Sequence, residues 1–285
     1  MRRAPVLFAC CCALALSCHA ILSGDARYVA CDDVAIPNDM RCIPGGEFTR
    51  GSERVSIEED TLKKVQDERP VQRIDLSTFL MDTTEVTYSA YQECVAAGAC
   101  KKAGPNYRGY SNPKQPMVGA NWFHARDYCA FRGKRLPTEA EWEKAARGPN
   151  GDLFPPGNEP LTCKNAIIQE NGQKGCGTGI TWDVASRPVE RYGLYDMAGN
   201  SWEWVADWYA KDYTACGPAC AGLNPRGPCE GADKCPGYTE KIVRGGSWWW
   251  DAEYALGSNR RPHFPANKPF HHFGFRCARD AAVTE

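Results

Sequence analysis

The 285-residue chain has a net charge of −1, with 43% hydrophobic and 24% charged residues. This balance allows one large or two small domains with a sizeable core, and it gives no sign of nucleic acid or an anionic membrane surface as a partner. The 27 glycines and 20 prolines predict many turns and a loop-rich body.

The first 20 residues have the pattern of a cleaved export signal. Two arginines precede an apolar run over residues 6–16, which is too short to span a bilayer as a helix. Residues 16–18 (Leu-Ser-Cys) resemble a lipoprotein box that would leave Cys18 as a lipidated first residue, whereas residues 18–20 form a plain small-residue cleavage site. We favour the lipoprotein site and keep both open. Residues 21–35 are then expected to be a linker.

Strand and loop signals dominate the next segment. Residues 42–48 predict a strand entered through a turn, and residues 71–81 alternate with β-forming side chains. Residues 52–69 lie between them and are charged and poor in apolar groups, so we expect an exposed loop.

Three helices follow in chain order. The first is expected over residues 87–98, with Thr87 as its N-cap. Asn121 caps a second helix that ends at Gly133. Thr138 opens a capping box for a third helix, which stops at Gly148. Beyond Gly148 the regular signals fade into prolines and glycines, and no second domain boundary is visible.

Cysteines supply the order that these loops lack. Four of the 16 lie in the signal, and the remaining twelve predict disulfides in an oxidising compartment. Local spacing predicts three pairs and leaves the last two cysteines to each other: Cys31–Cys42, Cys94–Cys100, Cys163–Cys176 and Cys129–Cys277. The remaining cluster consists of Cys216, Cys220, Cys229 and Cys235. Its irregular spacing favours two disulfides over a four-thiolate zinc site, and the spacing does not fix which cysteines pair.

Several motifs resemble those of the formylglycine-generating enzyme, or sulfatase-modifying factor, family, and they occur in the same order as in that family. They include CIPGGEF (42–48), DTTEVT (82–87), ARDYCAFRGKRLPTEAEWE (125–143), YGLYDMAGNSWEW (192–204), RGGS (244–247) and GFRCARD (274–280). The resemblance covers a domain over residues 36–282. It implies an α+β, loop-rich fold related to C-type lectins, and it also implies that Cys129 pairs with Cys277.

The resemblance also locates the family's oxidase centre. Family enzymes convert a sulfatase cysteine to formylglycine with oxygen, through two cysteines that bind copper(I) after the GGS turn. Trp250 and Ala255 stand at these two positions, and no cysteine lies between Cys235 and Cys277. Neither side chain can ligate copper, so copper is not expected.

A calcium ion is the metal that the resemblance favours. Asp196 and Glu203 would offer carboxylates, and Gly199 and Ser201 would offer backbone carbonyls, which suits the oxygen preference of calcium.

Four residues are candidates for the cleft beside the absent copper: Ser247, Trp250, Arg260 and His263. Ser247 is expected to hydrogen-bond in a turn, and exposed aromatic side chains near Arg260 would bind a peptide or sugar. In a strand, Trp248 and Trp250 would share one face.

Histidines offer little support for an iron site. The candidates are His124, His263, His271 and His272. His124 is expected to lie on a helix and to pack or face solvent. His271 and His272 are adjacent, so an extended chain would point them to opposite faces.

The sequence therefore predicts an exported, calcium-stabilised binding module that recognises an extracytoplasmic peptide or glycan. It would be periplasmic, attached to the cell envelope or secreted, and it would contact a membrane only through a lipid anchor. The first alternative is a divergent metal-dependent oxidoreductase or protein-modifying enzyme that acts on a protein or a small thiol. The second is a copper oxidase with ligands from residues 216–235. The oligomeric state is not predicted.

Overall fold

The computed structural model describes residues 28–54, 66–105, 107–155, 157–266 and 270–282. The predicted signal and lipidated Cys18 lie outside these residues. Among the helices that are described, none is long and apolar enough to cross a membrane.

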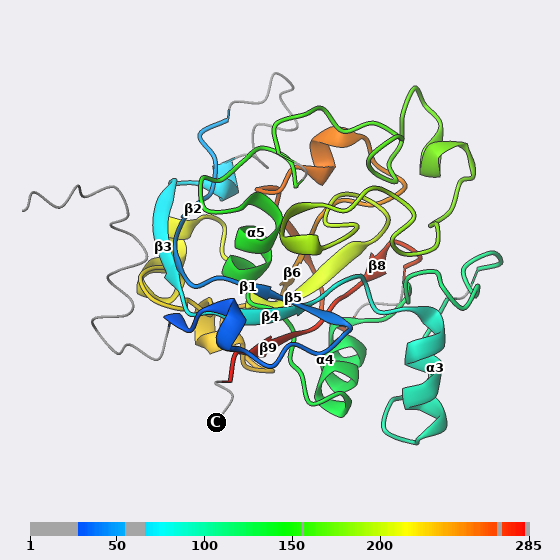
Figure 1. Cartoon of the computed structure of the whole chain (residues 1–285), viewed down its shortest axis with the longest axis horizontal. Coiled ribbons are helices and arrows are strands. Elements are labelled where there is room, and N and C mark those ends of the chain that lie inside the picture. Colours follow the sequence, from blue (N-terminus) through cyan, green and yellow to red (C-terminus); the bar gives the residue numbers. More distant parts are fainter. Residues whose placement is uncertain (1–27, 55–65, 106, 156, 267–269, 283–285) are drawn as a thin grey trace, which may run out of the picture.

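Three small sheets form the β part of the fold (Figure 1). In the first, β4 (Phe79–Asp82) pairs antiparallel with β1 (Met40–Ile43) and β9 (Ala278–Asp280). In the second, β2 (Gly46–Arg50) pairs antiparallel with β3 (Gln72–Leu76). The third has the order β7 (Arg261–His263), β6 (Lys241–Arg244), β5 (Trp202–Trp208) and β8 (Phe273–Gly274), with only β5 and β8 parallel.

Each of the two predicted N-terminal strand segments is divided in two. The 42–48 signal covers the end of β1 and the start of β2, and the 71–81 signal covers β3 and most of β4. Both breaks meet at one point, where the Gly45 amide donates to Thr78 Oγ1 over 3.1 Å. A Cβ on Gly45 would lie 2.9 Å from the Thr78 nitrogen, so the close approach requires glycine.

The three predicted helices are present as α3 (Tyr88–Ala96), α4 (Trp122–Phe131) and α5 (Glu139–Arg147). Their predicted caps hold, because Thr87, Asn121 and Thr138 each accept a backbone N–H of the first turn. The remaining helical turns are short: η2 (Cys31–Asp33), η3 (Gln66–Glu68), η4 (Lys174–Gly177), η5 (Arg191–Gly193), α6 (Tyr213–Cys216), η6 (Gly217–Cys220), η7 (Pro228–Gly231) and η8 (Ala252–Ala255).

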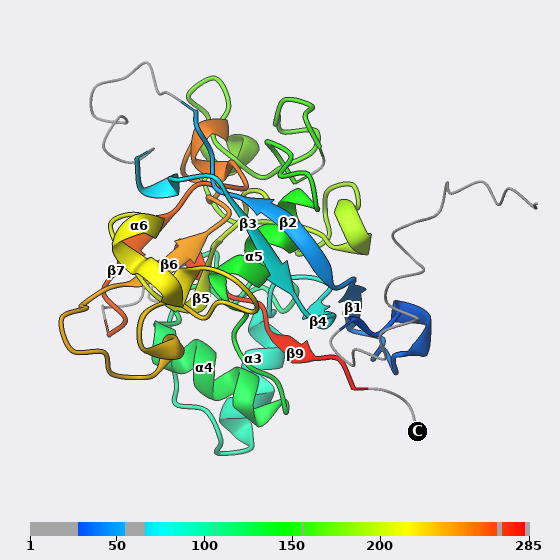
Figure 2. The ribbon, with the colours of Figure 1, turned by 90° about the vertical axis from the view of Figure 1, so that its left-hand side faces the viewer.

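Helix α5 lies at the centre of the molecule, behind the β2–β3 pair and close to β5 (Figure 2). All nine of its residues are buried, including its acidic and basic ones. Trp142 of α5 packs in the core with Met197 and Val205, and Trp202 and Trp204 of β5 enter a neighbouring core that includes α4. The central helix therefore needs partners for several buried charges.

Two segments are more ordered than the sequence indicated. Residues 28–35, predicted as linker, join the domain, because Val34 is buried and Thr78 Oγ1 donates to the Val29 carbonyl over 2.7 Å. In the predicted exposed loop 52–69, Asp67 and Glu68 are only 2% and 1% exposed. Asp67 is fixed from outside its own segment, since its carbonyl accepts from Arg260 over 2.7 Å.

Six disulfides join all twelve cysteines of the described residues. Four are the pairs given by the sequence: Cys31–Cys42, Cys94–Cys100, Cys163–Cys176 and Cys129–Cys277. The cluster between α6 and β6 pairs locally, as Cys216–Cys220 and Cys229–Cys235. This arrangement leaves no thiol of the cluster for zinc or for relocated copper ligands.

Removal of the long-range disulfide should cost more stability than removal of a local one. Cys129 and Cys277 are 148 residues apart, and Cys216 and Cys220 are 4 apart. From loop-closure entropy, we expect the Cys129→Ala/Cys277→Ala variant to lose about 5 kcal/mol of unfolding free energy and the Cys216→Ala/Cys220→Ala variant about 2 kcal/mol. Urea unfolding followed by tryptophan fluorescence measures both. Equal losses would contradict this ranking.

Candidate functional site

The turn after β6 lies against the second of the two family copper positions, Ala255. Gly245 and Gly246 both have positive φ, at 92° and 75°, and Ser247 behind them is fully buried. A Cβ on Gly246 would lie 2.8 Å from Ala255 Cα, so the glycine lets the two segments touch. The Trp250 amide donates to the Ser247 carbonyl over 3.1 Å, which closes the turn.

This turn replaces the strand that the sequence suggested for residues 248–250. Strand β6 ends at Arg244, and Trp248 is buried whereas Trp249 and Trp250 are half-buried. The expectation that Trp248 and Trp250 share a strand face is wrong, because the glycine pair bends the chain before them.

Trp250, Tyr254 and Arg261 form what we call the aromatic ledge. The Trp250 and Tyr254 rings lie 4.8 Å apart between centroids, tilted by 37°. The Arg261 guanidinium carbon lies 5.0 Å from the Trp250 centroid, within cation–π range. Ala255, at the second copper position, is fully buried in a neighbouring core cluster. The ledge offers ring faces and a cation where the family oxidase has thiolates.

A cavity of about 270 Å³ lies beside the ledge. Its lining combines aromatic, apolar and charged side chains: Asp67, Tyr209, Tyr254, Asn259, Arg260, Arg261 and Pro262. The Tyr209 hydroxyl donates to Asp67 Oδ2 over 2.9 Å. Burial raises the pKa of Asp67 to about 7, although Arg260 and the Tyr209 hydrogen bond favour its ionised form.

Arg260 is a structural residue and not the free cleft cation that the sequence suggested. It is 3% exposed, and its Nε and Nη2 donate to the Glu139 carboxylate over 2.7 and 3.1 Å. Its Nη1 donates to the carbonyls of Asp67 and Ala210. Its charge is therefore used to hold α5.

His263 is half-buried on β7 and packs against other rings. Its centroid lies 4.4 Å from that of Phe273 and 5.9 Å from that of Trp204. Burial lowers its pKa below the usual value for histidine. Of the four predicted cleft residues, Trp250 lies on the ledge and Arg260 lines the cavity, whereas Ser247 and His263 support the surrounding structure.

The other histidines also act locally. His124 Nδ1 accepts from the Asn121 amide over 3.3 Å and completes the cap of α4. His271 and His272 have ring centroids 4.2 Å apart, so their expected placement on opposite faces is wrong. They occupy a turn and not an extended segment. Within the described ranges, no group of three or more His, Cys, Asp or Glu side chains could hold a metal ion.

The predicted calcium loop is occupied by an ion pair. Glu203 Oε1 accepts from Arg276 Nη2 over 2.6 Å, and Oε2 accepts from Arg276 Nε over 2.7 Å and Trp142 Nε1 over 2.8 Å. Asp196 Oδ2 accepts from the Ala185 amide over 2.7 Å. Burial raises the pKa of Asp196 to about 6. As placed, the Glu203 carboxylate does not fit a calcium ligand, because both oxygens face Arg276.

A third carboxylate, which sequence reasoning missed, completes this network. Glu85 Oε1 accepts from the Ser201 amide over 3.0 Å and from its hydroxyl over 2.6 Å, and Oε2 accepts from Asn200 Nδ2 over 2.8 Å. Burial, together with nearby Asp196 and Glu203, raises the pKa of Glu85 well above its usual value. Glu85 belongs to the DTTEVT motif, which indicated the family resemblance without indicating a role for any of its residues.

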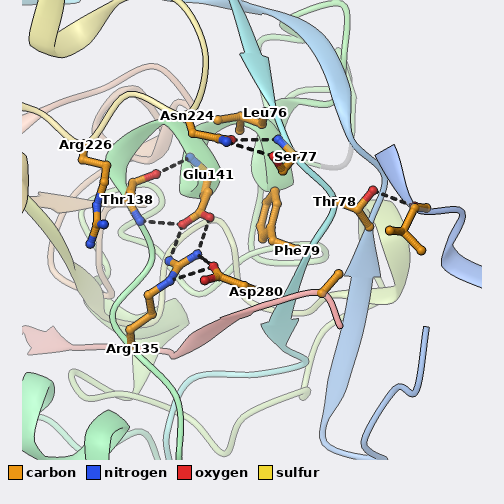
Figure 3. Close-up of a pocket in the computed structure, with 12 residues that line it drawn as sticks. Leu76, Ser77, Thr78, Phe79, Arg135, Thr138, Glu141, Asn224, Arg226 and Asp280 are labelled. Atoms are coloured by element: carbon orange, nitrogen blue, oxygen red, sulfur yellow. Dashed lines mark hydrogen bonds and ion pairs between the residues drawn. The ribbon is translucent and has the colours of Figure 1, made fainter. Parts of the chain in front are cut away.

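A larger cavity, of about 490 Å³, lies elsewhere, between the β3–β4 link and the chain near Asp280 (Figure 3). Arg135 points there toward Glu141 and Asp280 (Figure 3), and its Nη1 and Nη2 donate to Glu141 over 2.7 Å each. Glu141 and Asp280 thus both hold the Arg135 guanidinium, and neither the ledge residues nor the two copper positions line this cavity. The ledge and its cavity are therefore the better candidate site.

Comparison with known proteins agrees with the resemblance. Residues 29–281 match the family model of the sulfatase-modifying factor enzyme 1-like domain (FGE-sulfatase). The formylglycine-generating enzyme of Bos taurus is 30% identical over 306 residues, which cover 87% of this chain and 76% of that protein. The serine/threonine-protein kinase pkn1 of Chlamydia pneumoniae is 33% identical over 268 residues, or 86% of this chain.

The match to the kinase is confined to part of it, since the chain spans only 38% of the kinase's length. Among solved structures, PvdO from Pseudomonas aeruginosa superimposes with a TM-score of 0.66 at 26% identity, covering 87% of this chain and 97% of that one. Sequence and fold agree over nearly all of the described residues. The chain belongs to the sulfatase-modifying factor (formylglycine-generating enzyme-like) family.

Proposed function

We propose that this domain is a binding module of its family and not a copper oxidase, and that it recognises a peptide or a glycan outside the cytoplasm. The observation that carries this proposal is the replacement of both copper positions, by the half-buried Trp250 and the buried Ala255. Neither side chain has an atom that ligates copper(I). Every cysteine of the described residues is already in a disulfide, so no nearby thiol substitutes.

The aromatic ledge supplies a surface suited to binding. The ring faces of Trp250 and Tyr254 bury apolar area against a ligand, and the Arg261 guanidinium adds a hydrogen-bonding cation. The Trp250 and Tyr254 rings pack against the core cluster that includes α3, α4 and β5, and the Trp250 amide bonds to the GGS turn, so the ledge is held in place before a ligand arrives. Six disulfides support a location in an oxidising compartment such as the periplasm, the cell envelope or the medium.

Copper binding tests the loss of oxidase chemistry. We expect the wild-type domain to bind no copper(I) tightly and to leave the cysteine of a sulfatase-type peptide unoxidised. The Trp250→Cys/Ala255→Cys variant should bind about one copper(I) per chain, because two thiolates suit this ion, while either single variant should not. Elemental mass spectrometry and peptide mass analysis read out both. Retention of a redox metal by the wild type, with peptide oxidation, would favour the divergent enzyme instead.

Loss of the ledge should weaken ligand binding. Trp250→Ala removes one of the two ledge rings, and we expect about a tenfold loss of affinity for the glycans or peptides that the wild type retains on arrays. Phe131→Ala is the matched control, because Phe131 is 42% exposed at the end of α4, outside the ledge. Equal binding by the two variants would place the binding surface elsewhere.

We propose calcium as a stabilising ion of the loop at residues 196–203, in competition with Arg276. The support is the gathering of buried carboxylates from Glu85, Asp196 and Glu203 around a single guanidinium. Oxygen-rich sites of this kind suit calcium once the guanidinium is removed.

Removal of that guanidinium should be costly and partly reversible by calcium. Arg276→Met leaves the buried Glu203 carboxylate without its cation, and we expect a loss of about 3–5 kcal/mol of unfolding free energy. Calcium should raise the melting temperature of this variant more than that of the wild type, and adding Glu203→Gln should abolish the difference. If titration calorimetry detects no calcium binding to either protein, calcium is excluded.

A further inference from the structure

We propose that the cavity beside the aromatic ledge is a subsite for one hexuronic acid unit of an acidic polysaccharide. The carboxylate of the sugar would pair with Arg261, its ring would lie against the ledge, and its hydroxyl groups would donate to Asp67. This inference rests on the proposed binding function and specifies the ligand class.

Arg261 is the cation of the cavity that lacks an acidic partner. Its guanidinium lies 5.0 Å from the Trp250 centroid and 5.5 Å from that of Trp202, and it forms no ion pair with a carboxylate of the described residues. The neighbouring Arg260 differs, since it is held by Glu139. Arg261 is only partly solvated, and this burial lowers the pKa of its guanidinium. A ligand carboxylate would complete its coordination in the planar, two-point manner that guanidinium favours.

Asp67 provides a hydrogen-bond acceptor on the wall of the same cavity. It is 2% exposed and lines the cavity, and only its Oδ2 is satisfied, by the Tyr209 hydroxyl. Its Oδ1 is buried and accepts no hydrogen bond from the part of the chain that the structure describes. A buried acceptor without a partner favours a ligand that brings a donor.

Both demands are met by one acidic sugar. A hexuronate carries a carboxylate at one position, hydroxyl donors around its ring, and an apolar ring face for Tyr254 and Trp250. The cavity, at about 270 Å³, is slightly smaller than the roughly 300–1,000 Å³ of sites for drug-sized molecules, which fits a single ring.

An acidic peptide fits less well. Its side-chain carboxylate would satisfy Arg261 but carries no donor of its own, so Asp67 would depend on a peptide N–H from a separate part of the ligand. The edge strand β7 contains Pro262, which has no N–H to offer an added peptide strand.

Titration calorimetry with a short oligogalacturonate and its methyl ester tests the proposal on the whole domain. The ester keeps the shape of the sugar but removes its charge, and we expect it to bind about tenfold more weakly to the wild type. Arg261→Gln should bind acid and ester equally. Arg73→Gln is the control, because Arg73 is 65% exposed on β3, outside the cavity, and this variant should keep the preference.

The pH dependence tests Asp67 separately. At pH 6 this group is mostly neutral and at pH 8 mostly ionised, so affinity for the always-ionised oligogalacturonate should fall as the pH rises. Asp67→Asn should flatten this profile. The charged and titratable groups that face Asp67 are Arg260, Glu68, Glu139 and Tyr209, and the variant leaves all four unchanged.

Three results would overturn the inference. Equal binding of acid and ester to the wild type would show that Arg261 does not recognise the carboxylate. This comparison needs only the wild type, so it holds even if Arg261→Gln fails to fold. Binding of acidic peptides or free amino acids in preference to oligogalacturonate would replace the sugar while leaving the proposed binding function in place. Failure of every saccharide to bind would also overturn it, whereas the binding function itself falls only if copper binding and peptide oxidation are found.

Discussion

The rest of the structure depends on the buried ion pairs that helix α5 makes with arginines from distant segments. Glu143 Oε2 accepts from Arg244 Nη2 over 2.7 Å, and Glu139 accepts from Arg260. A nine-residue helix is marginal alone in water, so its stability comes from these partners and from Trp142. Each pair is also a constraint, because a buried charge that loses its partner destabilises the fold strongly.

That constraint fixes the segment that carries the candidate site. Arg244 also donates to the carbonyls of Gly257 and Ser258, so the chain from the GGS turn to β7 is clamped at both ends. Successive side chains of an extended chain point to opposite sides. Arg260 therefore enters the core, while Arg261 next to it reaches the Trp250 ring. One arginine stabilises the fold, and its neighbour is left for the ligand.

The pair of Arg276 with Glu203 does the same for the loop before β5. Glu203, Glu85 and Asp196 gather their negative charge in the interior, where burial raises the pKa values of Glu85 and Asp196. The fully buried Arg276 guanidinium offsets part of this charge, and the Trp142 indole N–H adds a hydrogen bond. Because Trp142 belongs to α5, this second network joins the first through one helix.

Local features of the fold follow from the sequence alone. The caps Thr87, Asn121 and Thr138 depend on neighbours within one helical turn, and the close cysteine pairs depend on short loops, so both can be predicted without tertiary structure. The family motifs likewise identified the fold and placed Trp250 and Ala255 at the copper positions.

Only the tertiary structure decided which charged residues serve the fold and which face a cavity. Arg260 and Glu139 are 121 residues apart, and Arg276 and Glu203 are 73 apart, so no local pattern links them. Contacts between distant segments also bury Asp67 within a charged stretch of sequence. Likewise, no local pattern predicted the turn that brings the rings of His271 and His272 together. Local propensity sets caps and turns, whereas the partner of a buried charge is chosen by the packing of the whole chain.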